Sequence, residues 1–129
     1  MLSAKYFDLM KVIWLFVDGL GLGEGGSQNP LYSPEIKRLN DLLLTAKTID
    51  ACMGVPGIPQ SATGQTSIFC GVNAQNIIGA HVEGFPTKKL REIISKENIY
   101  IKLRELGMTS TFANGYWIDD KRELPQDRK

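Results

Sequence analysis

One short apolar run constrains the fold of this chain more than any other feature of its sequence. Residues 12–17 (VIWLFV) are all apolar, are rich in β-branched and aromatic side chains, and do not alternate with polar residues. This pattern is typical of a central parallel strand that is buried on both faces. We therefore predict a strand over residues 11–17. Asp18 then stands at the carboxyl end of that strand, where open α/β sheets bind ligands.

A second stretch, residues 59–66 (PQSATGQT), places a hydroxyl at the predicted start of a helix. Prolines and glycines within residues 54–59 exclude a regular element there, and Ser61 follows as a candidate N-cap of a helix over residues 62–72. Free N–H groups and the positive dipole end at such a position favour a phosphate group. Thr63, Gln65 and Thr66 add hydroxyl and amide groups within one turn. A capping serine on a polar helix face is the alternative interpretation.

The remaining pattern predicts an α/β fold with a mainly parallel sheet flanked by helices. Further strands are predicted over 48–53 and 108–113, and residues 73–86 are predicted to be irregular. Apolar residues at helical spacing predict helices over 34–44, 86–95 and 96–106, the last stopped by Gly107. Three strands make a thin sheet, so its edges need further chain or another copy to cover them.

Length and charge limit the classes of protein that this chain can belong to. Its 129 residues fit one domain at most, which we divide into an N-terminal extension (1–10), an α/β domain (11–118) and a charged tail (119–129). The net charge of +1 gives no reason to expect nucleic acid or an anionic membrane as a partner. The longest apolar run is too short to span a bilayer, and no secretory signal is evident. We interpret Cys52 and Cys70 as reduced thiols of a cytoplasmic protein.

Other polar and glycine residues leave alternatives open. Asp18 is either a metal ligand or a carboxylate that caps backbone amides of its own loop. The spacing of Gly21, Gly23 and Gly26 matches the dinucleotide-binding fingerprint, but this interpretation is disfavoured because no helix is expected directly behind the glycines. His81 is the only histidine, so no serine–histidine–aspartate triad can be built around it.

The order and spacing of two motifs, VDG at residues 17–19 and PQSATGQT at residues 59–66, resemble the alkaline phosphatase superfamily. The resemblance is to the metalloenzyme branch that contains cofactor-independent phosphoglycerate mutase and phosphopentomutase. It extends from about Lys11 to Tyr116 and includes the EGFP segment at residues 83–86. It implies an alkaline-phosphatase-like core with two divalent metal ions, manganese or zinc. It also puts Ser61 in the place of the nucleophile that touches the metals, and Asp18 in the place of the first metal-binding aspartate.

The resemblance also implies what this chain contributes to such an enzyme. Gln65 stands where the family usually has histidine, and the family takes most of its metal ligands from a later C-terminal portion that has no counterpart here. We therefore expect an incomplete core: the N-terminal part of a metal-dependent phosphatase or phosphomutase for a small phosphorylated substrate, inactive or weakly active alone. Thr63 and Gln65 are the predicted phosphate-binding residues. The alternative is a non-catalytic small α/β domain that binds an anion or nucleotide. The enzymatic hypothesis predicts that Ser61 Oγ and an Asp18 oxygen lie a few ångström apart.

Overall fold

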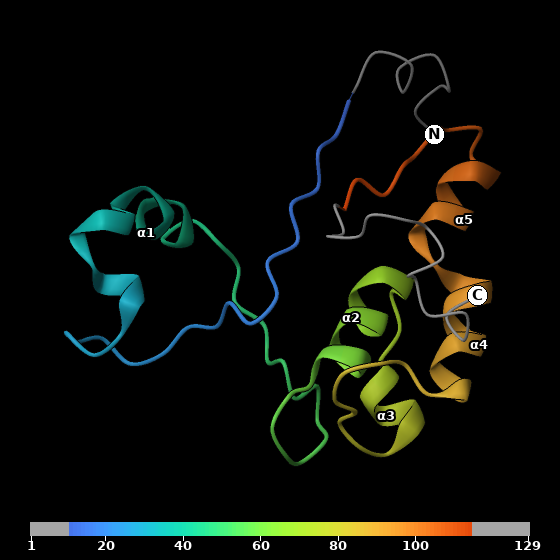
Figure 1. Cartoon of the computed structure of the whole chain (residues 1–129), viewed down its shortest axis with the longest axis horizontal. Helices are drawn as coiled ribbons and strands as arrows, with labels where there is room; N and C mark the ends of the chain where they lie inside the picture. The colour runs from blue at the N-terminus through green and yellow to red at the C-terminus, as the bar shows by residue number, and fades with distance from the viewer. Residues whose placement is uncertain (1–10, 115–129) are drawn as a thin grey trace, which may run out of the picture.

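The computed structural model describes residues 11–114, and all regular structure within them is helical (Figure 1). The α-helices are α1 (Lys37–Leu43), α2 (Ser61–Cys70), α3 (Ala74–Ile78), α4 (Lys88–Glu97) and α5 (Ile99–Glu105). Two short 3₁₀ helices, η2 (Pro30–Tyr32) and η3 (Pro34–Ile36), precede α1. The predicted N-terminal extension and charged tail lie outside the described residues.

The predicted α/β fold with a mainly parallel sheet is wrong, because residues 11–114 contain no strand. Apolar, β-branched residues favour an extended backbone, but a strand exists only where another chain segment pairs with its N–H and C=O groups. Within the described residues, no backbone hydrogen bond connects 11–17, 48–53 and 108–113 with one another. Burial on both faces is also wrong for the first segment, since Ile13 is 96% exposed and Leu15 82% exposed.

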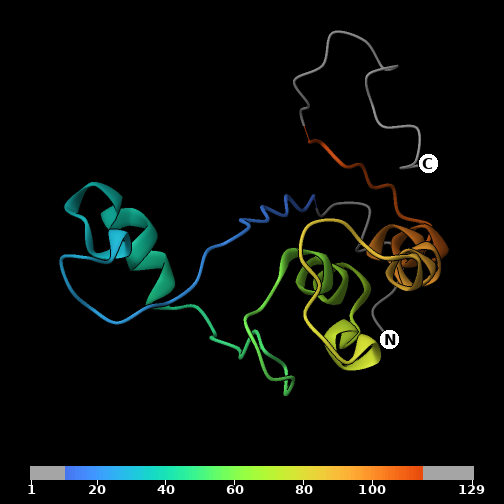
Figure 2. The same ribbon diagram turned by 60° about the horizontal axis from the view of Figure 1, so that its bottom comes forward.

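The described helices form two groups that lie apart in both ribbon views (Figures 1 and 2). The first, which we call the α1 group, consists of α1 with η2 and η3. Helix η3 begins with a typical N-terminal cap. The Ser33 hydroxyl accepts a hydrogen bond from the Glu35 N–H over 3.4 Å, and Pro34 occupies the first turn. The helix predicted over residues 34–44 is thus confirmed, as η3 continued by α1.

The second group, which we call the helical cluster, consists of α2, α3, α4 and α5. Helix α2 contacts both α3 and α4, and α4 contacts α5. The buried apolar core is small and comprises Ala62 of α2, Ala74 of α3 and Leu90 of α4. Beside it lies a buried polar pair, in which the Ser67 hydroxyl bonds the amide oxygen of Gln75. These contacts fix α2 as the central helix of the cluster.

Helix α3 was not predicted, whereas the last two helices were. Its N-cap is Asn73, whose side chain accepts a hydrogen bond from the Asn76 N–H over 3.0 Å. Helices α4 and α5 confirm the two helices predicted over 86–106, each beginning two or three residues later than expected. The predicted stop at Gly107 is also confirmed, since its φ is +73° and its N–H donates to the Arg104 carbonyl over 2.9 Å.

No helix formed by residues 11–114 combines the length and the apolar character that crossing a membrane requires.

Candidate functional site

Three of the predicted site residues meet at the start of α2. The Ser61 hydroxyl donates a hydrogen bond to Asp18 Oδ2 over 3.2 Å. The Gln65 side-chain amide donates to the same oxygen over 3.1 Å. Ser61 and Gln65 lie one helical turn apart, so both side chains point from one face of α2 toward Asp18. We call these three residues the Asp18 cluster.

Asp18 reaches α2 because the segment before it packs on that helix. The rings of Trp14 and Phe16, two residues apart, lie against the ring of Phe69 with centroid distances of 5.1 and 5.6 Å. Asp18 then uses both carboxylate oxygens: Oδ1 accepts from the Gly19 N–H over 3.1 Å, and Oδ2 accepts from α2. The local capping interpretation of Asp18 is therefore realised, together with a contact to Ser61.

Ser61 is the first residue of α2 rather than its N-cap. Gln60 occupies the N-cap position with extended backbone angles (φ −128°, ψ 152°), and its side chain makes no capping hydrogen bond. The Ser61 hydroxyl is consequently not used to cap the helix and donates to Asp18 instead. The Ala62 N–H donates to the Val82 carbonyl over 3.0 Å, while the N–H groups of Ser61 and Thr63 have no acceptor among residues 11–114.

The structure does not bring Thr63 together with the Asp18 cluster. Thr63 is fully buried on the inner face of α2. Its hydroxyl donates to the Gln60 carbonyl over 3.3 Å and accepts from the Val82 N–H over 3.2 Å. The Thr63 side chain thus ties α2 to the segment before α4, and its role in phosphate binding stays a prediction.

The donors of the Asp18 cluster fit part of a metal site. A carboxylate and a hydroxyl are hard oxygen ligands of the kind that manganese and magnesium prefer. One carboxylate cannot balance the charge of two divalent ions, and no group of three or more histidine, cysteine, aspartate or glutamate side chains occurs within residues 11–114. Asp18 and Ser61 therefore offer two oxygen ligands for one metal ion, and the two-metal centre stays a prediction.

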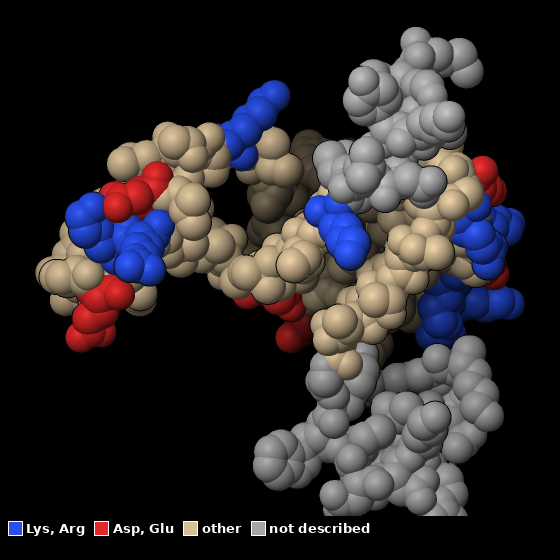
Figure 3. Space-filling model, turned by 90° about the horizontal axis from the view of Figure 1, so that it is seen from above, with Lys and Arg blue, Asp and Glu red and all other residues tan. Residues whose placement is uncertain are grey.

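Charged side chains elsewhere on the described surface are mixed. On the face shown in Figure 3, acidic and basic side chains lie next to one another over the α1 group. There Lys37 and Asp41 form an exposed ion pair of 2.7 Å one helical turn apart. Such pairs contribute little to stability, so we assign them no role beyond solubility.

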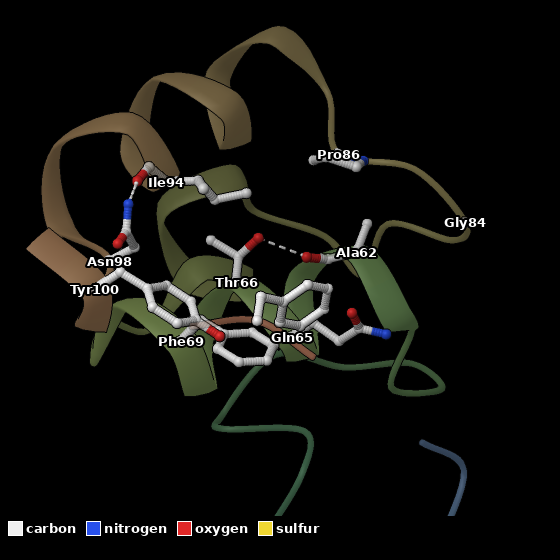
Figure 4. Close-up of a pocket in the computed structure, with 10 residues that line it drawn as sticks. Ala62, Gln65, Thr66, Phe69, Gly84, Pro86, Ile94, Asn98 and Tyr100 are labelled. Atoms are coloured by element: carbon white, nitrogen blue, oxygen red, sulfur yellow. Dashed lines mark hydrogen bonds between the residues drawn. The ribbon is translucent and has the colours of Figure 1, made fainter. Parts of the chain in front are cut away.

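A pocket that the sequence analysis missed adjoins the cluster. It has a volume of about 300 Å³, lies between α2 and the α4–α5 pair, and is lined by Gln65 of the Asp18 cluster (Figure 4). The α2 residues that line it are spaced at i, i+3, i+4 and i+7, namely Ala62, Gln65, Thr66 and Phe69. This helical spacing was readable in the sequence and marks one continuous face of α2.

Comparisons with protein-family models, with curated proteins and with solved structures found no match to this chain.

Proposed function

We propose that the Asp18 cluster is part of the site of a divalent-metal-dependent phosphoryl-transfer enzyme, a phosphatase or phosphomutase, in which Ser61 is the nucleophile. The observation that carries the proposal is the 3.2 Å hydrogen bond from the Ser61 hydroxyl to Asp18 Oδ2. It joins the two motifs whose order resembles the alkaline phosphatase superfamily. The substrate is a small phosphorylated molecule. The two free thiols, Cys52 and Cys70, support a cytoplasmic location.

In the proposed reaction, Ser61 and Asp18 act as a nucleophile and its orienting base. The carboxylate accepts the Ser61 hydroxyl proton as Oγ forms a bond to phosphorus and the ester P–O bond breaks. The leaving oxygen takes a proton from water, and the hydroxide that remains takes up the proton that Asp18 received from Ser61. Gln65 donates to the same carboxylate oxygen and thereby holds Asp18 in the position from which it orients Ser61.

A phosphate group bound beside Asp18 also requires a positive charge nearby, because the phosphate and the carboxylate are both anions and repel each other. Asp18 and Ser61 would hold a manganese or zinc ion through oxygen, and such an ion supplies that charge when bound. Among residues 11–114 no group of three or more histidine, cysteine, aspartate or glutamate side chains adds further ligands. The N–H group of Ser61 at the start of α2, which has no acceptor among residues 11–114, adds a further attraction for phosphate.

Covalent phosphorylation of Ser61 tests the proposal. The chain is incubated with manganese and p-nitrophenyl phosphate, and the phosphorylated residue is located by mass spectrometry, which detects a single event per chain. We expect phosphate on Ser61 and none after Ser61→Ala. The matched control is Ser95→Ala, because Ser95 is an exposed helical serine away from the cluster, and this variant should be labelled like the wild type.

The same experiment separates the enzyme from a non-catalytic anion-binding protein. A binding protein takes up inorganic phosphate, measured by calorimetry, but leaves Ser61 unmodified. Phosphate binding without phosphoserine, or equal labelling of wild type and Ser61→Ala, would contradict the proposed function.

A further inference from the structure

Helix α2 presents the Asp18 cluster and the pocket on adjoining positions. Gln65 belongs to both, since its amide nitrogen donates to Asp18 and its side chain lines the pocket (Figure 4). Ala62, the residue after Ser61, lines the pocket as well. Ser61 therefore lies within one turn of α2 from two residues that line the pocket, Ala62 and Gln65.

The surface of the pocket is apolar and aromatic. Phe69, Tyr100 and Phe112 contribute three rings, and the rings of Tyr100 and Phe112 meet edge to face at a centroid distance of 6.3 Å. None of the lining residues is charged.

Two of the polar side chains that line the pocket, Thr66 and Asn98, already bond the backbone, and Gln65 bonds Asp18. The Thr66 hydroxyl donates to the Ala62 carbonyl over 2.7 Å, and the Asn98 amide donates to the Ile94 carbonyl over 2.7 Å. Because these groups are satisfied, the pocket favours carbon over a polar or charged ligand group. A carboxylate would lose its hydration here without meeting a positively charged side chain among the lining residues.

We infer that the pocket binds the aromatic leaving group of the substrate, so that the substrates are phosphate monoesters of aromatic alcohols; this inference rests on the proposed function. A volume of about 300 Å³ is at the small end of ligand pockets and accommodates one or two fused rings. The ring lies among Phe69, Tyr100 and Phe112, the phosphate lies at Ser61, and Gln65 separates the two parts.

Binding of two probes of different shape tests this inference. Affinities for p-nitrophenyl phosphate and methyl phosphate are measured by calorimetry on the full chain with manganese. We expect the aromatic ester to bind at least about tenfold more tightly, because a ring removes much more apolar surface from water than a methyl group does. Equal affinities for the two esters would overturn the inference.

A pair of matched variants tests whether the preference for p-nitrophenyl phosphate over methyl phosphate arises in the pocket. Phe112 is 53% exposed and lines the pocket, so Phe112→Ala should fold and should lose most of the preference. Leu106 is 73% exposed and lies outside the pocket lining, so Leu106→Ala should keep it. A preference that survives in Phe112→Ala would also overturn the inference.

Binding of free p-nitrophenol to the wild-type chain tests the pocket inference independently of the proposed function. The nuclear magnetic resonance signals of the Tyr100 and Phe112 rings should shift when p-nitrophenol is added. If those signals shift but Ser61 is never phosphorylated, the pocket stands and the proposed function is wrong. If Ser61 is phosphorylated equally well by both esters and no ring signal shifts, the function stands and the pocket inference is wrong.

Discussion

The Ser61 hydroxyl donates a hydrogen bond to Asp18 Oδ2 over 3.2 Å, although the two residues lie 43 positions apart in the chain. The contact depends on two separate packing events. Phe69 of α2 receives the rings of Trp14 and Phe16, and α2 itself is held by α3 and α4. A helix and an irregular segment thus bring together two side chains that the sequence predicted to meet at the edge of a sheet.

Replacing Asp18 by asparagine should reduce catalysis much more than stability. Asp18→Asn keeps the size of the side chain but removes the charge that accepts the Ser61 proton. We expect phosphorylation of Ser61 to fall by about a hundredfold or more, as for loss of a general base. The free energy of unfolding should change by less than about 1 kcal/mol, because the contacts of Asp18 are exposed.

Asp41→Asn is the matched control for this prediction. Asp41 pairs with Lys37 on the exposed face of α1, away from the helical cluster. The rate of Ser61 phosphorylation, followed by mass spectrometry, should equal that of the wild type. Equal rates in Asp18→Asn and Asp41→Asn would mean that Asp18 has no part in the reaction.

Two variants of Gln65 separate the loss of its hydrogen bond to Asp18 from the addition of a negative charge. Gln65→Met removes the donor to Asp18 and keeps a side chain of similar length. Gln65→Glu removes the donor and adds a second negative charge beside Asp18, which costs more because like charges repel. We expect the rate of Ser61 phosphorylation to fall in the order wild type, Gln65→Met, Gln65→Glu. A rate for Gln65→Glu at or above that of Gln65→Met would contradict the positioning role of Gln65.

The sequence predicted local helix signals better than it predicted the fold. Capping at Ser33 and termination at Gly107 depend on a few neighbouring residues, so both were readable locally. Helix α3 was missed because five residues show too little periodicity, although Asn73 before it is a recognisable cap. The strand over residues 11–17 was predicted wrongly because pairing is decided by distant segments, which no local pattern reveals.

The meeting of Asp18 with Ser61 was predictable only from the order of the two motifs, since neither residue indicates the other locally. Thr63 shows the limit of such reasoning, because its side chain points to the buried face of α2. The pocket was missed for a related reason. It needs Tyr100 and Phe112 to approach α2, and that approach is a matter of tertiary packing.

Substitution of Gly57 tests how tightly the segment before α2 packs against His81. Gly57 has a φ of +124°, and a Cβ added there would lie 3.1 Å from Cδ2 of His81. His81 cannot give way easily, because its Nε2 bonds the Val55 carbonyl at 2.9 Å. We therefore expect Gly57→Ala to lower the free energy of unfolding by about 1–3 kcal/mol, measured by denaturation with urea.

Gly64→Ala is the control, with an effect of opposite sign. Gly64 lies within α2, and a Cβ added there would meet no atom within 4 Å. Since alanine favours a helix over glycine, this variant should raise the free energy of unfolding by about 0.5–1 kcal/mol. If Gly57→Ala is as stable as Gly64→Ala, the packing of His81 against residue 57 is not as described.

The thiol of Cys70 should make stability fall in alkaline solution. Burial raises the pKa of Cys70 above its ordinary value of 9.0, and Glu97 adds to this rise while Lys102 opposes it. A raised pKa means that the folded chain retains a proton that the unfolded chain has lost. Above pH 9.0, ionisation of the thiol stabilises the unfolded state relative to the folded state. The free energy of unfolding therefore decreases as the pH rises.

Cys70→Ala isolates this contribution from the other groups that titrate in the same range. The substitution removes a buried sulfur and should lower stability at every pH, but the decrease between pH 8 and pH 10.5 should be shallower than in the wild type. The measurement is urea denaturation across that interval, on about six buffers of equal ionic strength, because exposed charges are screened by salt. Parallel pH profiles for the two proteins would show that Cys70 ionises equally well in the folded and unfolded chain, contrary to its burial at the end of α2.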